Sequence, residues 1–392
     1  MRPQISQIFA KSFYLRKSVL FAITGLILFS CNDNLLEEKK SELGPPKKNH
    51  YASYFKIYKE ENFSVLITYL NPAKTDSAVY VLYNGEAKEP DFKAPLYYGI
   101  KAPVKNAACL SSVFIGFMSR LGVLEKVSGV DNGDYISNTF IQQQLKTGKI
   151  KELAKNGQLN FEQTVLSGNH ILFCNPSGDR KKDFDERFGR ASIFPIVCAD
   201  YFENHPLGRA EWIKAIALFF GEEEKADSLF AETEKKYLAL KSMADTCAYK
   251  PSVFTELKTG DTWFVVGGKS STAQFLNDAG ANYLWKDNGK IDVTALNMEQ
   301  VIQKALNADY WVNLHLSNGA KDILLMDKRY GEFKAFKTGN LYNNNGMLNE
   351  KGGNDYWETG LCNPDQILSE LIKIFHPNLL TETKLKYYKQ LK

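Results

Sequence analysis

Hydrophobic and polar positions follow a helical period most clearly between Arg209 and Met243. Apolar residues recur there every three or four positions and Glu and Lys occupy the opposite face, which predicts amphipathic helix. Gly221 divides the stretch into two helices. The second has roughly 20 residues and would span about 30 Å, the diameter of a small domain. We interpret it as a long rigid helix that links two lobes, although an ordinary surface helix within one domain would show the same pattern.

A strand-like pattern marks residues 51–98. Short runs of β-branched and aromatic residues lie at 54–58, 63–69 and 78–83. Turn-forming segments separate these runs, so the pattern predicts an N-terminal antiparallel β ribbon. Three strands alone are marginally stable, so this leader should pack on the lobe that follows.

Strand and helix patterns then alternate twice, over residues 99–205 and again over 250–392, with a helical segment at 206–249 between them. Such alternation implies parallel strands with helical crossovers. The predicted fold class is therefore α/β, with two Rossmann-like lobes joined by the long helix. Ligands in such folds bind beyond the carboxyl ends of the strands. The loops at these ends are residues 111–112, 131–135 and 175–178 in the first lobe and 267–270, 313–318 and 342–357 in the second.

The first 30 residues have the pattern of a lipoprotein signal peptide. Four basic residues precede an apolar run at 19–29, and no acidic residue occurs before Cys31. This order is typical of a secretory signal, and the run is short for a membrane span. Residues 28–31 (LFSC) resemble a bacterial lipobox. We therefore predict that Cys31 is lipidated and becomes the mature N-terminus, tethered to the fold by the polar residues 31–50.

The net charge gives no sign of a nucleic-acid partner. The whole chain carries a formal charge of +4. The basic residues of the predicted signal account for all of this excess, so the mature protein would be about neutral. A neutral protein offers no electrostatic footprint for nucleic acid.

Motifs for covalent chemistry or a closed metal site are absent from the sequence. The five histidines pair with neither a cysteine nor another histidine at metal-ligand spacing. No C-x-x-C and no common nucleophile motif occurs. These absences weigh against a hydrolase and against a protein-built metal site.

A Gly-Gly-Lys-Ser sequence at 267–270 looks like the end of a phosphate-binding loop, but Trp263 stands where that loop needs a glycine. Two interpretations remain: a plain turn, or a turn that lets backbone approach a ligand closely. Several aromatic residues also fall in or beside the strand-end loops. They are core residues or flat faces for a planar ligand. These aromatics are Tyr135, Trp263, Trp311, Tyr356 and Trp357.

Five stretches in colinear order resemble a lipoprotein branch of the ABC-transporter solute-binding proteins that serve iron–siderophore, haem and cobalamin uptake. This is the class III, helical-backbone group of periplasmic binding proteins. The resemblance covers about residues 51–380, including the strand-rich leader. The stretches are 105–138, 205–230, 261–288, 333–345 and 352–380.

The resemblance implies a receptor in the cell envelope rather than an enzyme. It would bind a metal chelate between its lobes as a monomer, carry no cofactor of its own, and deliver the chelate to a membrane permease with its ATPase. A ferric siderophore is the expected chelate, with cobalamin or haem as alternatives. The predicted ligand-binding residues are Ser111, Ser112, Tyr135, Trp263, Lys269, Asn313, Tyr356 and Trp357.

In this family one acidic residue on each lobe docks onto the permease. In the second lobe, Glu299 of the segment LNMEQ matches that position. In the first lobe the match is looser, and Asp179 is the nearest candidate, with Asp183 and Glu186 as alternatives. Glu299 also suits the first turn of a helix, where the helix dipole favours an acid.

Two other functions stay open at this stage. The protein could be an envelope scavenger that stores or relays the chelate without an ABC permease. It could also be an enzyme, since related two-lobed folds hold metal clusters, but the sequence offers no set of cysteine and histidine ligands for one.

Overall fold

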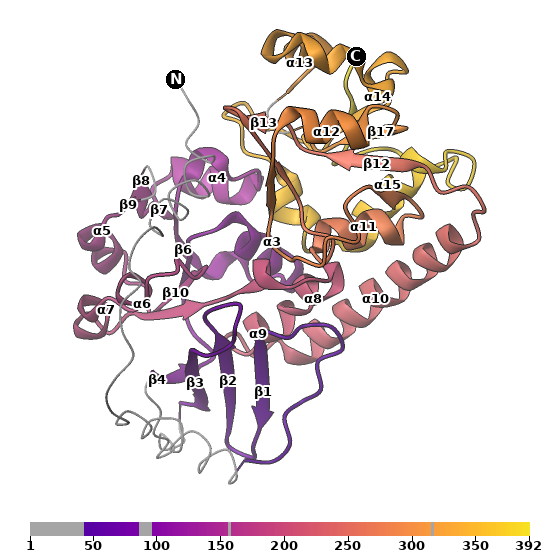
Figure 1. The fold of residues 1–392 in the computed structure, drawn as a ribbon. Coiled ribbons are helices and arrows are strands. Elements are labelled where there is room, and N and C mark those ends of the chain that lie inside the picture. Colours follow the sequence, from indigo (N-terminus) through magenta and orange to yellow (C-terminus); the bar gives the residue numbers. More distant parts are fainter. Residues whose placement is uncertain (1–42, 86–95, 156–157, 315–316) are drawn as a thin grey trace, which may run out of the picture.

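The computed structural model describes residues 43–392 except 86–95, 156–157 and 315–316. Figure 1 shows two α/β lobes side by side, a β sheet packed against the first lobe, and one long helix that runs from the first lobe along the second. The predicted fold class is thereby confirmed. Cys31 and the expected signal peptide lie outside the described residues. Among the described residues, no helix is both long enough and apolar enough to cross a membrane.

The leader forms a four-stranded sheet in the order β1-β2-β3-β4. The predicted antiparallel ribbon is confirmed as β1–β3, and a fourth strand that was not predicted pairs parallel with β3. One face packs on the first lobe, where the Tyr80 hydroxyl accepts the N–H of Val197 at 3.0 Å. The strands are β1 (Phe55–Lys59), β2 (Phe63–Tyr69), β3 (Ser77–Asn84) and β4 (Tyr97–Ala102).

The first lobe is built on a parallel sheet in the order β11-β10-β5-β6-β7. Four of its strands lie in the predicted runs. The strands are β5 (Ala107–Cys109), β6 (Val127–Val130), β7 (Lys151–Glu152), β10 (Ile171–Cys174) and β11 (Phe194–Val197), beside a small ribbon of β8 (Ala154–Lys155) and β9 (Gln158–Leu159). Its helices are α3 (Ser112–Leu121), α4 (Thr139–Lys146), α5 (Phe161–Leu166), α6 (Arg180–Asp183) and α7 (Glu186–Arg190).

The second lobe repeats the plan with a sheet in the order β15-β12-β17-β18-β19, in which only β19 is antiparallel to its neighbour. An antiparallel sheet of β13, β14 and β16 stands beside it. The strands are β12 (Ser252–Thr255), β13 (Lys258–Thr259), β14 (Thr262–Val265), β15 (Asn282–Tyr283), β16 (Thr294–Leu296), β17 (Tyr310–Val312), β18 (Leu341–Asn343) and β19 (Lys389–Gln390). The helices are α11 (Ser271–Asp278), α12 (Met298–Ala305), α13 (Ala320–Met326), α14 (Lys334–Lys337) and α15 (Pro364–Phe375).

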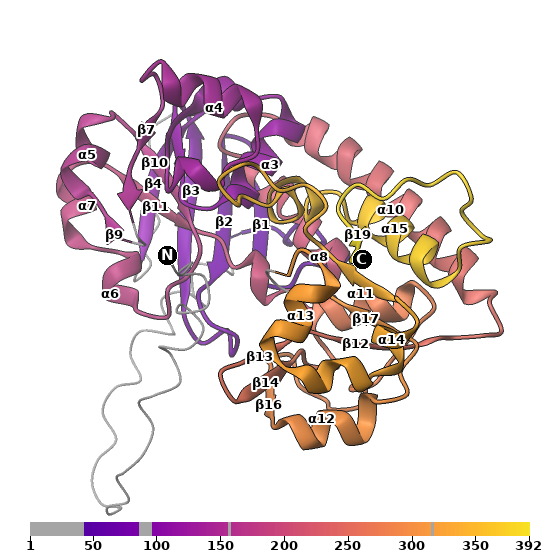
Figure 2. The ribbon, with the colours of Figure 1, turned by 90° about the horizontal axis from the view of Figure 1, so that it is seen from above.

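The linking segment comprises α8 (Pro206–Glu211), α9 (Ile213–Ala217) and the 23-residue α10 (Glu223–Asp245). Gly221 adopts φ +72°, a left-handed conformation suited to glycine, and ends the first part as predicted. In Figure 2, α15 of the second lobe lies along α10. The Tyr237 hydroxyl of α10 also donates to Asp278 Oδ2 of α11 at 2.8 Å. The long helix is therefore held by the second lobe as well as by the first.

Two buried carboxylates hold the start of the leader against the linking segment. Glu211 accepts the backbone N–H groups of residues 50–52 at 2.8–3.1 Å. Glu203 accepts those of residues 53–54 at 3.0 Å, and burial raises its pKa to about 7. Lys47 pairs with Ile57 of β1. The chain is therefore attached to the fold from residue 47, earlier than the expected end of the tether.

Candidate functional site

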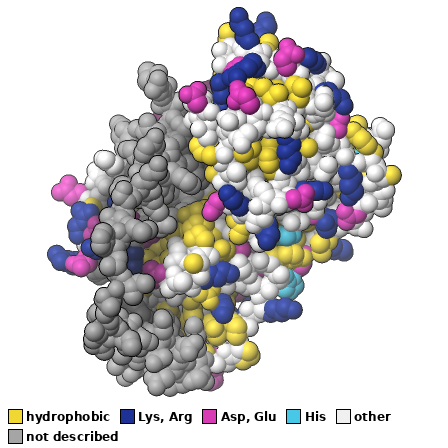
Figure 3. Space-filling view, in the orientation of Figure 1, with side chains coloured by type: hydrophobic (Ala, Val, Ile, Leu, Met, Phe, Trp, Pro, Cys, Tyr) yellow, Lys and Arg dark blue, Asp and Glu magenta, His cyan; other side chains and the backbone are white. Residues whose placement is uncertain are grey.

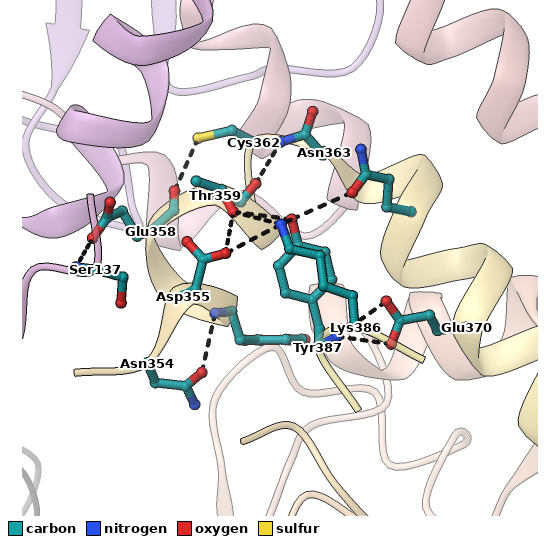
Figure 4. Close-up of polar contacts among 12 residues, drawn as sticks. Ser137, Asn354, Asp355, Glu358, Thr359, Cys362, Asn363, Glu370, Lys386 and Tyr387 are labelled. Carbon is teal, nitrogen blue, oxygen red and sulfur yellow. Dashed lines mark hydrogen bonds and ion pairs between the residues drawn. The ribbon is translucent and has the colours of Figure 1, made fainter. Parts of the chain in front are cut away.

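The two lobes meet where loops at the carboxyl ends of their strands touch. The Asn349 side chain, beyond β18 of the second lobe, donates to the carbonyls of Asp134 and Ile136 in the first lobe at 3.0 Å each. Glu358 Oε2 accepts the N–H of Ser137 at 2.7 Å (Figure 4). The segment 349–358 therefore crosses from the second lobe to the first.

A π-helical turn at Tyr356–Gly360 packs this crossing segment tightly against α3. A Cβ atom at Gly116 of α3 would lie 2.0 Å from the Glu358 carbonyl oxygen, so the close approach requires glycine. Glu358 is 1% exposed, and burial raises its pKa to about 7. The lobes are thus joined by a buried contact in addition to the long helix.

A pocket of about 180 Å³ opens in the first lobe beside this contact, at the carboxyl ends of β5 and β6. Ser111 precedes α3 as its capping residue, yet its hydroxyl makes no capping bond. Within the described part of the chain, no hydrogen bond or ion pair occupies the side chains of Ser111, Ser112, Asp131 or Tyr135. Burial and the charge of Glu152 raise the pKa of Asp131. The pocket is lined by Cys109, Leu110, Ser111, Ser112, Asp131, Asn132, Tyr135 and Ile136.

Polar groups at the strand ends of the second lobe are, in contrast, engaged with one another. Asn313, at φ +61°, accepts the Tyr388 hydroxyl at 3.0 Å. The side chains of Asn343 and Asn345 donate to the Ser317 carbonyl at 3.0 and 3.2 Å. Figure 4 shows the same pairing deeper in this lobe, where Asp355, Thr359, Lys386 and Tyr387 contact each other and Glu370 accepts the Tyr387 N–H.

The structure corrects the assignment of Trp263 to the ligand site. Trp263 is fully buried between the two sheets of the second lobe, stacks 5.6 Å from Trp311, and donates to the Thr255 carbonyl at 3.0 Å. Its neighbour Phe264 is 38% exposed, because successive residues of a strand face opposite ways. Trp263 therefore belongs to the core.

Tyr356 is also a core residue in this structure, and that assignment is corrected too. It is 4% exposed and lies 5.9 Å, ring to ring, from Tyr388. Burial raises its pKa to about 12. The adjacent Trp357 is 50% exposed and meets Tyr356 edge to face at 4.9 Å. Of this pair, only Trp357 offers a free aromatic surface.

The Gly267-Gly268 turn serves the chain's own packing. A Cβ at Gly267 would meet the Lys290 carbonyl oxygen at 2.3 Å, and one at Gly268 would meet the Lys286 carbonyl oxygen at 2.1 Å. The glycines therefore admit neighbouring backbone, which is the plainer of the two interpretations. Lys269 is exposed beside this turn, and its part in ligand binding stays a prediction.

Exposed aromatic residues remain on strand-end loops of both lobes. Tyr135 is 37% exposed in the first lobe, and Trp357 is exposed in the second. Tyr201, 41% exposed beyond β11, was not predicted, although it follows a predicted strand within a few residues. On the part of the surface that grey residues leave visible, Figure 3 shows apolar side chains in several separate patches.

A charged network beside the pocket was also missed. Arg209 of α8 donates to Asp200 Oδ2 at 3.0 Å, and Asn175 donates to Asp200 Oδ1 at 2.8 Å. The buried Nε of Arg209 has no partner among the described residues. Asn175 lies in a predicted strand-end loop. No local sequence pattern, however, places Arg209 beside Asp200.

A repeated motif identifies a surface acid that sequence reasoning missed. Leu-Asn-x-Glu-Gln occurs at 159–163 and at 296–300. In each lobe the asparagine caps a helix, accepting the N–H three residues later, and the helix leads to a parallel strand. Glu162 of the first lobe therefore occupies the place that Glu299 occupies in the second, and both are exposed.

Asp179 has a different setting. It caps the four-residue helix α6, and its carboxylate accepts the N–H of Lys181. Glu299 forms a surface ion pair with Arg329 at 3.3 Å and remains 73% exposed. The repeat thus favours Glu162 over Asp179 as the first-lobe residue equivalent to Glu299.

Metal-binding chemistry is not evident in the described part of the chain. No group of three or more histidine, cysteine, aspartate or glutamate side chains comes together there. The five described cysteines form no disulfide, and burial raises the thiol pKa of Cys109, Cys198 and Cys362.

Residues 108–345 match the family described as periplasmic binding protein. An uncharacterized lipoprotein of Methanocaldococcus jannaschii is 25% identical over 357 residues, which cover 85% of this chain and 82% of that protein. A second uncharacterized lipoprotein of that organism is 24% identical over 376 residues, covering 91% and 90%.

Solved structures share the fold. A periplasmic heme-binding protein from Roseiflexus superposes with a TM-score of 0.54 at 17% identity, covering 70% of this chain and 99% of its own. A protein from Saccharomonospora viridis, named as an ABC-type Fe3+-hydroxamate transport system, superposes with a TM-score of 0.53 at 18% identity, covering 71% and 95%. At these identities the likeness concerns the fold.

Proposed function

This chain belongs to the periplasmic binding protein family, and from that premise we propose that it is the substrate-binding receptor of an ABC importer for a metal chelate. Members of the family bind a solute and release it unchanged, so the protein is a binding protein and not an enzyme. The chelate would lie between the lobes. A ferric siderophore is the first candidate, with cobalamin and haem as alternatives.

The first-lobe pocket is the observation that carries this proposal. Its hydroxyls and carboxylate are half-buried and have no partner among the described residues, so the hollow suits a polar ligand that bonds to them. Tyr135 and Trp357 add flat apolar surfaces from the two lobes, of the kind that pack against a large planar or aromatic chelate. Structural neighbours named for heme and Fe3+-hydroxamate support the same ligand class.

The proposal includes two attachments. Lipid on Cys31 would hold the receptor at a membrane of the cell envelope, as the lipoprotein names of its relatives support. Glu162 and Glu299 would dock on basic residues of the permease, one from each lobe. We propose Glu162 in place of Asp179, because it stands at the position equivalent to Glu299. The receptor would act as a monomer.

Titration with ferrichrome, haem and cyanocobalamin, followed by tryptophan fluorescence, tests the ligand class. A wild-type protein that binds none of them would contradict it. Replacing both exposed aromatics, Tyr135→Ala with Trp357→Ala, should weaken binding by roughly ten- to a thousand-fold, since each contact of this kind contributes on the order of 0.7–2 kcal/mol. Tyr249→Ala is the matched control, because Tyr249 is 64% exposed near the amino end of β12. Unchanged affinity in the double variant would remove these aromatics from the site.

The alternative is an envelope scavenger that works without a permease. Charge removal at both docking positions, Glu162→Ala with Glu299→Ala, separates the two functions. For an importer receptor, uptake of the labelled chelate by cells should fall at least about tenfold, as expected when docking charges are lost. Chelate affinity of the purified variant should stay unchanged. Uptake that persists in this variant would favour the scavenger.

A further inference from the structure

The first-lobe pocket presents hydrogen-bond donors and an acceptor side by side. Ser111 and Ser112 follow β5, and Asp131 follows β6, whose last residue pairs with the last residue of β5. Helix α3 starts at Ser112 and has no acidic residue in its first turn. Its N-terminus therefore favours an acceptor atom on the ligand. Asp131, when ionised, can only accept.

Few small groups satisfy both sides of such a pocket. A ligand carboxylate would suit the start of α3 but would face Asp131, and like charges in a partly buried site repel each other strongly. An ammonium would suit Asp131 but would bring no acceptor to the serines and α3. A carboxamide brings both, because its oxygen accepts while its N–H donates. The raised pKa of Asp131 agrees, since the pocket already disfavours negative charge.

We propose that this pocket recognises a neutral carboxamide arm of the ligand, with Asp131 accepting its N–H and Ser111 and Ser112 donating to its oxygen. Asp131 thereby discriminates against chelates that present a carboxylate at the same place. This inference rests on the proposed function and narrows its ligand class from metal chelates in general to those bearing amide side arms. The segment 349–358, which meets residues 134–137, borders the same part of the first lobe.

Matched chelates test the proposal without changing the metal-binding core. Ferrioxamine B carries an ammonium arm, its N-succinyl derivative ends in a carboxylate, and the corresponding N-succinamoyl derivative ends in a carboxamide at the same distance from the iron. Cyanocobalamin and its monocarboxylic derivatives supply the same contrast on a second core. For whichever of the two chelates binds, the affinity of the wild-type protein for the amide form should exceed its affinity for the carboxylate form by at least about tenfold. This is the effect expected when a like charge is excluded.

Two variants separate recognition from folding. Asp131→Asn keeps the side-chain shape and should reduce the preference for amide over carboxylate to about threefold or less, because the repulsion is gone. Ser112→Ala should weaken binding of the amide chelate while keeping the discrimination against the carboxylate. Unchanged thermal unfolding in both variants shows that the effects belong to the site.

The outcomes are distinguishable. Tighter binding of the carboxylate or ammonium form than of the amide, or a preference that survives Asp131→Asn, overturns this inference and leaves the chelate receptor standing. A wild-type protein that binds neither ferrioxamine nor cobalamin, and neither ferrichrome nor haem, overturns the proposed function and this inference with it.

Discussion

The two lobes share one plan but use their strand-end loops differently. Both have a mostly parallel sheet and a helix capped by the Leu-Asn-x-Glu-Gln motif. At the first lobe, Ser111, Ser112 and Asp131 face a pocket without partners among the described residues. At the second lobe, Asn343 and Asn345 donate to the Ser317 carbonyl, and the Tyr388 hydroxyl donates to Asn313. The difference supports our proposal that the first lobe keeps polar groups for a ligand, while the second uses them to hold its own loops.

The physical reason lies in what an unpaired polar group costs. A buried donor or acceptor without a partner costs about 1–3 kcal/mol, so a fold keeps such groups only where something else bonds to them. In the second lobe, Asn313, Asn343 and Asn345 bond within the lobe, although the buried Ser317 Oγ and Asn345 Oδ1 have no partner among the described residues. The first lobe leaves its pocket polar and accessible, where water or a ligand can satisfy the groups.

The largest expected effect concerns the hydrophobic core of the second lobe. Trp263→Ala should destabilise the protein by about 3–5 kcal/mol, because it removes a fully buried aromatic from the core. Phe264→Ala, one residue along the same strand, should cost about 1 kcal/mol or less, since that ring is partly exposed. Urea unfolding of the two variants measures both values. Equal losses would contradict the assignment of Trp263 to the core and Phe264 to the surface.

A smaller effect tests the buried junction between the lobes. The pKa of Glu358 is raised to about 7 in the folded protein, above its usual value near 4.5, so the folded state binds the extra proton. Stability from this group is therefore present at low pH and lost as pH rises from about 4.5 through 7. Glu358→Gln mimics the protonated form. We expect the variant to match the wild type at pH 5 and to exceed it by on the order of 2 kcal/mol at pH 8.

Urea unfolding at the two pH values provides the measurement for Glu358. Glu203, whose pKa is also raised to about 7, titrates in both proteins and cancels in the difference. A stability difference that does not grow with pH would mean that Glu358 is ionised and satisfied in the folded state.

The smallest effect compares paired and unpaired hydroxyls directly. Tyr388→Phe removes the hydroxyl that donates to Asn313 in the second lobe and should cost about 1 kcal/mol. Ser111→Ala removes a hydroxyl that makes no capping bond and should change stability by less than about 0.5 kcal/mol. Thermal unfolding of both variants gives the comparison. A larger loss for Ser111→Ala would show that this hydroxyl serves the fold and is not reserved for a ligand.

Local periodicity made much of the fold predictable. The runs at residues 106–110, 126–130, 170–174 and 192–197 became β5, β6, β10 and β11 of the first lobe because apolar runs between turns specify buried strands. The long helix was predicted for the same reason. Strand β4 escaped prediction because its pairing with β3 joins segments separated by residues 85–96. Helix α4 also escaped prediction, because it has one fully buried residue, Ile141, and its apolar pattern is therefore weak.

The site was only partly predictable. Ser111, Ser112 and Tyr135, selected from strand-end loops, line one pocket in the structure, and their role in ligand binding stays a prediction. The same reasoning failed for Trp263, because alternation along a strand shows that neighbours face opposite ways without showing which face is buried. Glu162 was within reach of the sequence, since the repeated motif marks it.

The sequence by itself determined the two α/β lobes, the linking helix and the capped helices that carry Glu162 and Glu299. These features depend on residues close together in the chain, through periodicity and helix capping. Only the tertiary structure decided that Trp263 is core, that the segment 349–358 reaches the first lobe, and that Asp131 faces a pocket with no partner among the described residues. Each of these depends on which distant segments pack together, because burial and hydrogen-bond pairing are properties of the assembled fold.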